Sequence, residues 1–150
     1  MIVRNYAGGV VFSGDRVLLS KGEGGKWMLP RSKISKGQLS NEVVKKKMEE
    51  SGILAEFVST AGYTNYEYSS NPRQKPFCDK ITWYIMKSLN GHYKVNKEEN
   101  FTDGGFYDID EALNIITYSQ DKALVNLSYK KYKEIMAAQE GEKEEACGAV

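Results

Sequence analysis

The sequence predicts a mixed α/β fold in a single domain, and three observations support this. Its 150 residues suit one domain with a sizeable core. Runs with strand composition come first, one segment of helical periodicity interrupts them, and two helical segments follow near the end. No internal repeat divides the chain. The predicted order is therefore strand, strand, strand, helix, several strands, helix, helix.

The first strands are predicted within residues 6–12 and 16–20, which are β-branched and aromatic runs separated by Ser13-Gly14-Asp15. This spacing favours a hairpin. Gly8 and Gly9 inside the first run indicate either a bulge or a close approach of the backbone to another group. A third short strand at residues 27–29 is stopped by Pro30.

From Ser40 onward the period becomes helical. Val43, Val44 and Met48 fall at helical spacing, and Gly52 is a typical helix terminator. We expect Ser40 or the following Asn41 to cap the start of this helix. The segment therefore predicts a helix over residues 40–52.

The remaining elements follow the same reasoning. Residues 53–59 and 62–68 have strand composition, residues 81–86 give the strongest strand signal, and we expect that strand to be central. Asp108 is expected to cap one helix, and a longer helix from residue 119 carries Leu127 on its predicted apolar side. We assign residues 1–139 to the folded domain and residues 140–150 to a disordered acidic tail.

Charge and cysteine content indicate which partners and which cellular compartment to expect. The formal net charge is +1, and because residues 142–145 (EKEE) contribute −2, residues 1–141 carry +3. That surplus is too small to indicate a nucleic-acid partner. Residues 1–5 do not have the build of a signal peptide, and no apolar run approaches a membrane span. Cys78 and Cys147 do not suggest a disulfide framework, so we expect a soluble cytoplasmic protein.

Several motifs, taken in order, resemble the Nudix superfamily. They are A-G-G-V-V-F, R-V-L-L-S-K, K-W-M-L-P, a K-G loop, a helix ending in E-E-S-G-I, and the later F-Y-D-I-D-E-A-L. The resemblance covers roughly residues 3 to 136 and looks most similar to diadenosine-polyphosphate and diphosphoinositol-polyphosphate hydrolases. It implies an α/β/α sandwich on a mixed sheet, and Mg²⁺-dependent hydrolysis of a diphosphate linkage.

The chain departs from the Nudix box, G-x5-E-x7-R-E-U-x-E-E-x-G-U, in which U is apolar. That box places carboxylates on one helix face, where they hold Mg²⁺ beside the phosphates of the substrate. Counted back from Gly52, Glu49 and Glu50 take the paired acid positions, and Lys46 replaces the first acid. Counted from the loop, the segment is one residue too short. A second alignment leaves Glu50 alone on the metal face, with Lys47 in place of an acid.

A lysine therefore replaces a central carboxylate under either alignment. An ammonium there opposes a bound dication and favours a bound phosphate chain. We hypothesise that Lys46 or Lys47 anchors phosphate, with Lys33 and Arg31 contributing. The alternative is a helix face whose lysines are simply solvated.

Other candidate residues are supported less directly. Glu98, Glu99 and Asp103 lie where related enzymes place an additional acid for the metal. Tyr66 can stack on a base, although alternating tyrosines in a strand also form half-buried faces. Lys80 precedes the central strand and is a candidate phosphate contact.

Three functions follow from these observations. The first is a Nudix-fold protein that binds a nucleotide or another polyphosphate and hydrolyses it weakly or not at all, with or without a metal. The alternative is an active Mg²⁺-dependent hydrolase of dinucleoside polyphosphates, nucleoside triphosphates or diphosphoinositol polyphosphates that uses Glu49 and Glu50. A further alternative is an RNA- or protein-binding module, which the charge distribution does not require. No membrane partner is expected.

Overall fold

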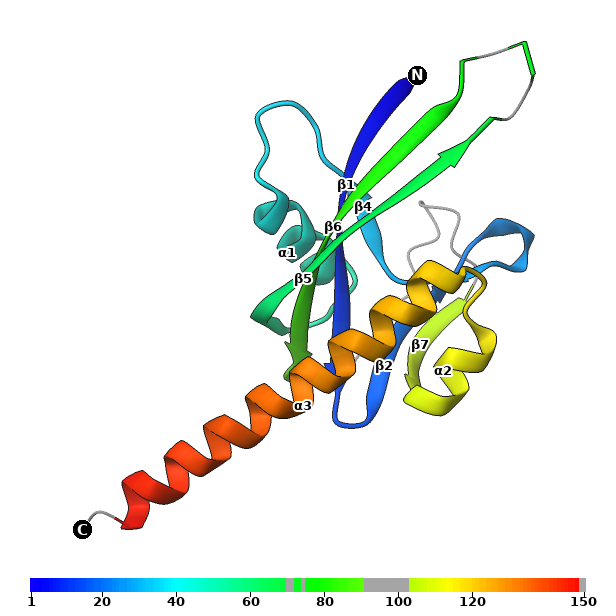
Figure 1. Ribbon diagram of the computed structural model, residues 1–150. Helices are drawn as coiled ribbons and strands as arrows, with labels where there is room; N and C mark the ends of the chain where they lie inside the picture. Colours follow the sequence, from blue (N-terminus) through cyan, green and yellow to red (C-terminus); the bar gives the residue numbers. More distant parts are fainter. Residues whose placement is uncertain (70–71, 74, 91–102, 149–150) are drawn as a thin grey trace.

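The computed structural model describes residues 1–69, 72–73, 75–90 and 103–148 (Figure 1). Its elements follow the predicted order of strands and helices. They are β1 (Ile2–Ser13), β2 (Arg16–Lys21), the 3₁₀ turn η1 (Glu23–Gly25), β3 (Trp27–Met28), β4 (Arg31–Lys33), α1 (Ser40–Glu50), β5 (Ala55–Tyr68), β6 (Phe77–Ser88), β7 (Asp103–Asp108), α2 (Ile109–Ile115) and α3 (Ser119–Gly148).

The strands of the described residues form one mixed sheet. Its main order is β3-β2-β1-β6-β5, with β4 paired to β1 and β7 paired to β2. β1 and β6 run parallel, with Ile2 opposite Phe77 and Phe12 opposite Lys87, whereas the other pairs are antiparallel. The strand predicted at residues 81–86 belongs to β6, which lies between β1 and β5 as expected for a central strand.

Helices cover both faces of this sheet (Figure 1). On β1, Val10 and Phe12 join a buried cluster with α2 and α3, whereas Val11 between them joins a second cluster with α1. This alternation follows from the period of two residues in a strand. The predicted α/β/α sandwich on a mixed sheet is therefore confirmed.

The glycines of β1 allow large side chains to lie against the sheet. A Cβ atom on Gly8 would be 2.2 Å from the ring of Trp83, and one on Gly9 would be 3.2 Å from the sulfur of Met86. Trp83 is fully buried and donates its Nε1–H to Thr64 Oγ1 over 2.7 Å. Because β1 and β6 pair without a register shift, the glycines mark a close approach and not a bulge.

Helix α1 begins at Ser40 as predicted and ends at Glu50, two residues before the predicted end, but its start is capped differently. Leu39 occupies the N-cap position and makes no side-chain cap, so the prediction that Ser40 or Asn41 caps the helix was wrong. The Ser40 hydroxyl is instead hydrogen-bonded to the Tyr84 hydroxyl of β6 at 2.5 Å, while Asn41 accepts from the next backbone amide. At the other end, Gly52 has a positive φ of 76°, as expected of a helix terminator.

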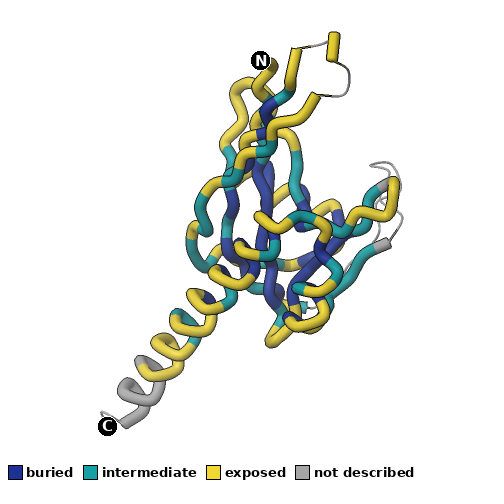
Figure 2. The backbone as a smooth tube through the Cα atoms, turned by 45° about the vertical axis from the view of Figure 1, so that its right-hand side comes forward, coloured by how far each residue is buried: buried dark blue, intermediate teal, exposed yellow. Residues whose placement is uncertain are grey.

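Helix α3 extends well beyond the body of the domain (Figures 1 and 2). Up to residue 141, its last buried side chain is Tyr132, and residues 137–141 are exposed. The helix continues to Gly148, into the segment for which disorder was predicted; Glu, Lys and Ala are good helix formers and suit this segment. Residues 149–150 lie outside the described part. No helix of the described residues is apolar over a membrane-spanning length.

The apolar side of α3 was predicted with one error. Leu124, Val125 and Tyr132 are buried against the sheet, but Leu127 is 66% exposed. The buried stripe passes through Ser128 instead, so the helix is rotated slightly from the predicted orientation.

Candidate functional site

Two cavities meet at β4 and contain most of the candidate residues. Arg31 lines the larger cavity, whereas Ser32 and Lys33 line the smaller one. The side chain of Ser32 points to the opposite face of the strand from that of Arg31, as alternation requires, and Lys33, the last residue of β4, lines the smaller cavity together with the loop that follows.

The smaller cavity lies between α1 and the segment that precedes it, and we call it the lysine cleft. Its volume is about 170 Å³. The residues that line it come from β4, from the following loop and from one face of α1. They are Ser32, Lys33, Ser35, Gln38, Val43, Lys46, Lys47 and Glu50.

The three consecutive lysines of α1 differ in exposure because they lie on different faces of the helix. Lys47 is only 5% exposed and shares the buried face of the helix with Val44 and Met48. Lys45 and Lys46 are exposed. Lys46 and Lys47 both line the cleft, but only Lys47 is largely withdrawn from water.

Burial has an electrostatic effect on Lys47. Loss of hydration lowers the pKa of its ammonium below the ordinary value, and the nearby Glu50 carboxylate partly opposes that change. An additional negative group in the cleft would stabilise the charged form of Lys47 in the same way. Lys47 is therefore an ammonium group that a bound anion would stabilise.

The loop on the other side of the cleft is held by hydrogen bonds. Gln38 Oε1 accepts from the Ser35 amide at 2.9 Å, and the Ile34 amide donates to the Asn5 carbonyl of β1 at 2.8 Å. These contacts fix the loop beside α1. Lys33 is exposed at the end of β4 and supplies a further ammonium to the cleft.

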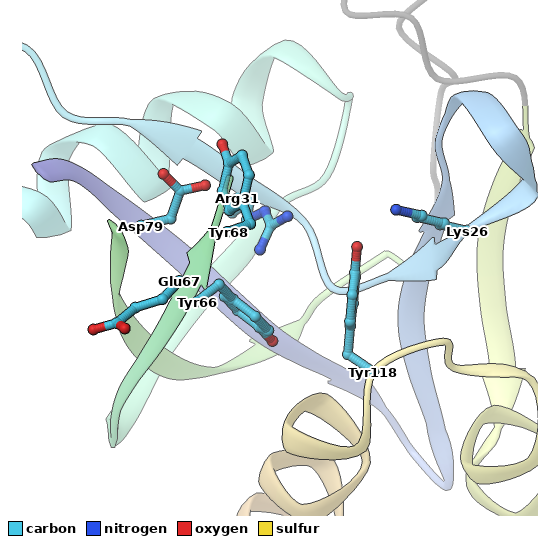
Figure 3. Close-up of a pocket in the computed structure, with 7 residues that line it drawn as sticks. All are labelled: Lys26, Arg31, Tyr66, Glu67, Tyr68, Asp79 and Tyr118. Carbon is cyan, nitrogen blue, oxygen red and sulfur yellow. The ribbon is translucent and has the colours of Figure 1, made fainter. Parts of the chain in front are cut away.

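The larger cavity lies on the other side of β4, and we call it the tyrosine pocket (Figure 3). Its volume is about 450 Å³, within the range of small-molecule sites. Three tyrosines, two cationic and two acidic side chains line it. They are Tyr66, Tyr68, Tyr118, Lys26, Arg31, Glu67 and Asp79.

Two hydrogen bonds bring the distant parts of the tyrosine pocket together. The Trp27 amide donates to Thr117 Oγ1 at 2.9 Å, and the Thr117 amide donates to the Trp27 carbonyl at 3.0 Å. They join β3 to the loop between α2 and α3. As a result, the Lys26 ammonium lies 5.7 Å from the centre of the Tyr118 ring.

Arg31 lies between aromatic rings and has unused hydrogen-bonding capacity. Its guanidinium carbon is 5.5 Å from the centre of the Tyr66 ring and 5.9 Å from that of Tyr6. Its Nη1 atom is buried without a hydrogen-bond partner. In Figure 3 the guanidinium points into the space that Tyr66, Tyr118 and Lys26 surround.

Asp121, in the first turn of α3, lies fully buried behind Tyr66. It accepts a short hydrogen bond from the Tyr66 hydroxyl through Oδ1, and its Oδ2 atom has no partner. Burial raises the pKa of the Asp121 carboxyl, while the bond from Tyr66 and the charge of Arg31 lower it. Burial and the same bond raise the pKa of Tyr66, so its hydroxyl keeps its proton.

The outer wall of the tyrosine pocket is held by an ion pair. Arg4 Nε donates to Asp79 Oδ1 at 2.9 Å, and its guanidinium lies 4.7 Å from the Phe77 ring centre and 5.6 Å from that of Tyr68. The bond to Asp79 raises the pKa of Arg4. The charge of Asp79 is therefore compensated by Arg4. Among the described residues that line the pocket, Arg31 and Lys26 are the cations.

The structure separates the residues that the sequence grouped. Lys33, Lys46 and Lys47 meet in the lysine cleft, but Arg31 is a strand residue that lines the tyrosine pocket, so its expected place beside them was wrong. Tyr66 lines the tyrosine pocket. Lys80 is exposed on β6 and lines neither cavity.

Lys26 and Tyr118 of the tyrosine pocket, and Asp121 behind it, were not anticipated. They come from a loop, from an interhelical segment and from a helix start. Their sequence context is ordinary for an exposed loop or a helix first turn. The reciprocal bonds between Trp27 and Thr117 bring Lys26 and Tyr118 together, and Asp121 is held by Tyr66.

The predicted acids do not form a metal-binding group within the described residues, where no three His, Cys, Asp or Glu side chains are placed to hold an ion. Glu50 lines the lysine cleft, but Glu49 is exposed and does not. Glu98 and Glu99 lie outside the described residues. Asp103 opens β7, and only its backbone is described.

No protein-family model and no curated protein matches this chain. Solved structures do resemble it. An ADP-ribose pyrophosphatase from Streptococcus suis aligns over 86% of this chain and 91% of its own, with a TM-score of 0.65 and 18% identity. A C. elegans Ap4A hydrolase aligns over 87% and 98%, with a TM-score of 0.64 and 14% identity. A MutT Nudix hydrolase from Burkholderia pseudomallei aligns over 84% and 98%, with a TM-score of 0.61 and 17% identity. The chain therefore has the fold of the Nudix hydrolases.

Proposed function

We propose that this Nudix-fold protein binds a nucleotide or another polyphosphate in the lysine cleft and hydrolyses it weakly or not at all. The structural neighbours act on ADP-ribose and on Ap4A, both of which contain linked phosphates. A polyphosphate is therefore the ligand class that the fold favours. The local chemistry of the cleft favours binding over Mg²⁺-dependent hydrolysis.

The observation that carries this proposal is the position of Lys47. Lys47 is 5% exposed and lines the cleft together with the exposed Lys33 and Lys46. Glu50 is the one acid among the described residues that line this cleft. Three ammonium groups against one carboxylate give the cleft a positive charge, which suits a phosphate chain.

The same geometry favours the alignment in which Lys47 takes the place of a box carboxylate. Val44 and Met48 are buried, while Lys47 and Glu50 face the cleft. Glu49, which the other alignment counts among the acids, is exposed and outside the lining. We infer that the acidic face of the Nudix box is reduced to Glu50.

Mg²⁺ does not fit the donor set of the lysine cleft. Magnesium is bound through carboxylates and waters in near-octahedral geometry, and the cleft offers one carboxylate beside an ammonium. Two unit charges 4 Å apart interact by about 4 kcal/mol at a surface-like dielectric, so a lysine in place of an acid opposes the dication strongly. We therefore assign the role of the metal in holding phosphate to the lysines.

A binding experiment with inorganic tripolyphosphate tests this proposal. We expect calorimetric titration to show binding that does not require Mg²⁺. Lys47→Met is expected to weaken binding about tenfold, which corresponds to the loss of one charge-assisted contact. Lys46→Ala is expected to have a smaller effect, because Lys46 is exposed. Lys80→Met is the matched control and should leave binding unchanged, because Lys80 lies outside the cleft.

A turnover screen provides the opposing outcome. We expect negligible phosphate release from dinucleoside polyphosphates and nucleoside triphosphates with Mg²⁺. Mg²⁺-dependent turnover that Glu50→Gln abolishes would instead establish an active hydrolase and sink the binding-only proposal. Unchanged tripolyphosphate affinity in Lys47→Met would also contradict it.

A further inference from the structure

The tyrosine pocket contains a hydrogen-bond donor that has no acceptor. Arg31 and Lys26 carry only donors, and Arg31 Nη1 is buried with no partner. The hydroxyl of Tyr66 already donates to Asp121. A ligand that satisfies Arg31 must therefore present acceptor atoms.

The walls of the tyrosine pocket suit a planar group. The ring centres of Tyr66 and Tyr118 are 5.3 Å apart with an interplanar angle of 57°, so the two rings form a tilted corner. Arg31 covers the Tyr66 ring and Lys26 covers the Tyr118 ring, at 5.5 and 5.7 Å from the ring centres. Aromatic faces flanked by cations favour stacking of a flat heterocycle.

The charge balance favours a neutral ring over a phosphate in the tyrosine pocket. Asp79 is paired with Arg4, and Glu67 points away from Arg31 in Figure 3, but the buried Asp121 carboxyl lies close enough to Arg31 for their charges to interact. A phosphate bound at Arg31 would be repelled by the Asp121 carboxylate. A neutral ring can satisfy Arg31 without that repulsion.

We propose that the tyrosine pocket binds a 6-oxopurine ring, as in guanine or hypoxanthine, whose O6 and N7 atoms face Arg31. A guanidinium fork matches two neighbouring acceptors with two parallel hydrogen bonds. Adenine offers N7 beside an amino group, and that amino group meets a side chain with no acceptor. This inference rests on the proposed function in taking the natural ligand to be a nucleotide, and it names the class of its base.

Nucleosides test the pocket without involving the lysine cleft, because they carry no phosphate. In NMR chemical-shift titrations we expect guanosine and inosine to bind about tenfold more tightly than adenosine. We expect 7-deazaguanosine, which lacks the N7 acceptor, to bind more weakly than guanosine. That comparison uses the unmodified protein, so it does not depend on the folding of any variant.

Variants assign the selectivity to Arg31. Arg31→Gln is expected to bring guanosine and adenosine affinities within about twofold of each other, because the bidentate fork is lost. Arg31→Lys keeps the charge but not the fork and should reduce the preference similarly. Arg16→Gln is the matched control: Arg16 is exposed, pairs with Asp108 and lines neither cavity, so selectivity should be unchanged.

Two results would overturn this inference. One is equal binding of adenosine and guanosine by the unmodified protein. The other is no nucleoside binding, together with tripolyphosphate affinity that falls in Arg31→Gln, which would place phosphate in the tyrosine pocket. The proposed function is judged separately, since it depends on tripolyphosphate affinity in Lys47→Met and not on nucleoside selectivity.

Discussion

The lysine cleft and the tyrosine pocket recognise ligands by different physical means, although both use residues of β4. The cleft is small and its lining carries three ammonium groups against one carboxylate. The pocket is more than twice as large, and its cations, Arg31 and Lys26, lie against tyrosine rings. Charge is therefore the main attraction in the cleft, whereas stacking and hydrogen-bond geometry are the main attractions in the pocket.

This difference shows how a fold can keep ligand recognition when its metal site is altered. A single change of charge in α1 alters the cleft, because its attraction depends on net charge. The pocket depends on the shape and positions of residues from the loop before β3, from β4, β5 and β6, and from the α2–α3 loop. The two sites can therefore change independently.

The largest expected effect comes from Gly8→Ala, which would disturb both sites at once. The added Cβ would lie 2.2 Å from the fully buried ring of Trp83, so β1 and β6 must move apart. We expect a loss of about 3 kcal/mol in the free energy of unfolding, measured by urea denaturation. Gly9→Ala is the matched control with a smaller expected loss, because its nearest contacts, with Met86 and Val11, are at 3.2 Å and not at 2.2 Å. Equal losses in the two variants would contradict this explanation.

Lys47→Glu is expected to give the next largest effect, confined to the lysine cleft. It changes the local charge by two units, so tripolyphosphate affinity should fall by about a hundredfold or more. The new carboxylate would lie one turn from Glu50, and calorimetry should detect Mg²⁺ binding that the unmodified protein lacks. Guanosine affinity should stay the same. Tripolyphosphate binding that survives this change would show that the cleft is not the phosphate site.

A change in ionic strength should affect ligand binding at the two sites differently, with a smaller effect than that of Lys47→Glu. Raising the ionic strength from about 0.05 M to about 0.5 M shortens the screening length several-fold, so tripolyphosphate affinity should fall by about tenfold. Guanosine carries no net charge, and its affinity should change by less than about twofold. Similar salt dependences for the two ligands, measured in the same titrations, would remove the proposed difference between the sites.

The smallest expected effect is a pH dependence of stability that arises behind the tyrosine pocket. Burial raises the pKa of Asp121 above its ordinary value of 3.8. Between the ordinary pKa, which applies to the unfolded chain, and the higher pKa in the folded protein, the folded protein binds a proton that the unfolded chain does not. The free energy of unfolding therefore falls as the pH rises through this interval. Asp121→Asn should flatten that slope in thermal melts at acidic pH. An unchanged slope would assign the dependence to other carboxyl groups.

The fold was largely predictable from the sequence because its signals are local. Apolar and β-branched runs mark the strands, and of the two alternatives that the paired glycines of β1 indicated, a bulge or a close approach, the structure shows the close approach, to Trp83. The errors at Leu127 and at the cap of α1 arose from tertiary contacts. The hydroxyl of Ser40, for example, is engaged by Tyr84 of a distant strand.

The site was predictable only in part. The sequence named two adjacent lysines as candidates for the cleft; both line it, but the burial of Lys47 depends on the rotation of α1 against the sheet. Arg31 was grouped with the lysines because it is near them in sequence, although the structure places it in the lining of the other cavity. Asp121 could not be recognised, because its burial depends on Tyr66, which is 55 residues away in the chain.

Two side chains of α3 have a consequence for the behaviour of the protein at high concentration. β5 ends the strand order of the sheet, and an end strand can recruit a strand from another molecule. Lys131 Nζ donates to the Thr60 carbonyl at 3.1 Å, and Gln120 Nε2 donates to the Asn65 carbonyl at 3.2 Å. These bonds occupy two carbonyls of β5 and lay α3 across the strand. α3 therefore protects the sheet from joining other sheets, so shortening this helix would favour aggregation as well as weaken the core.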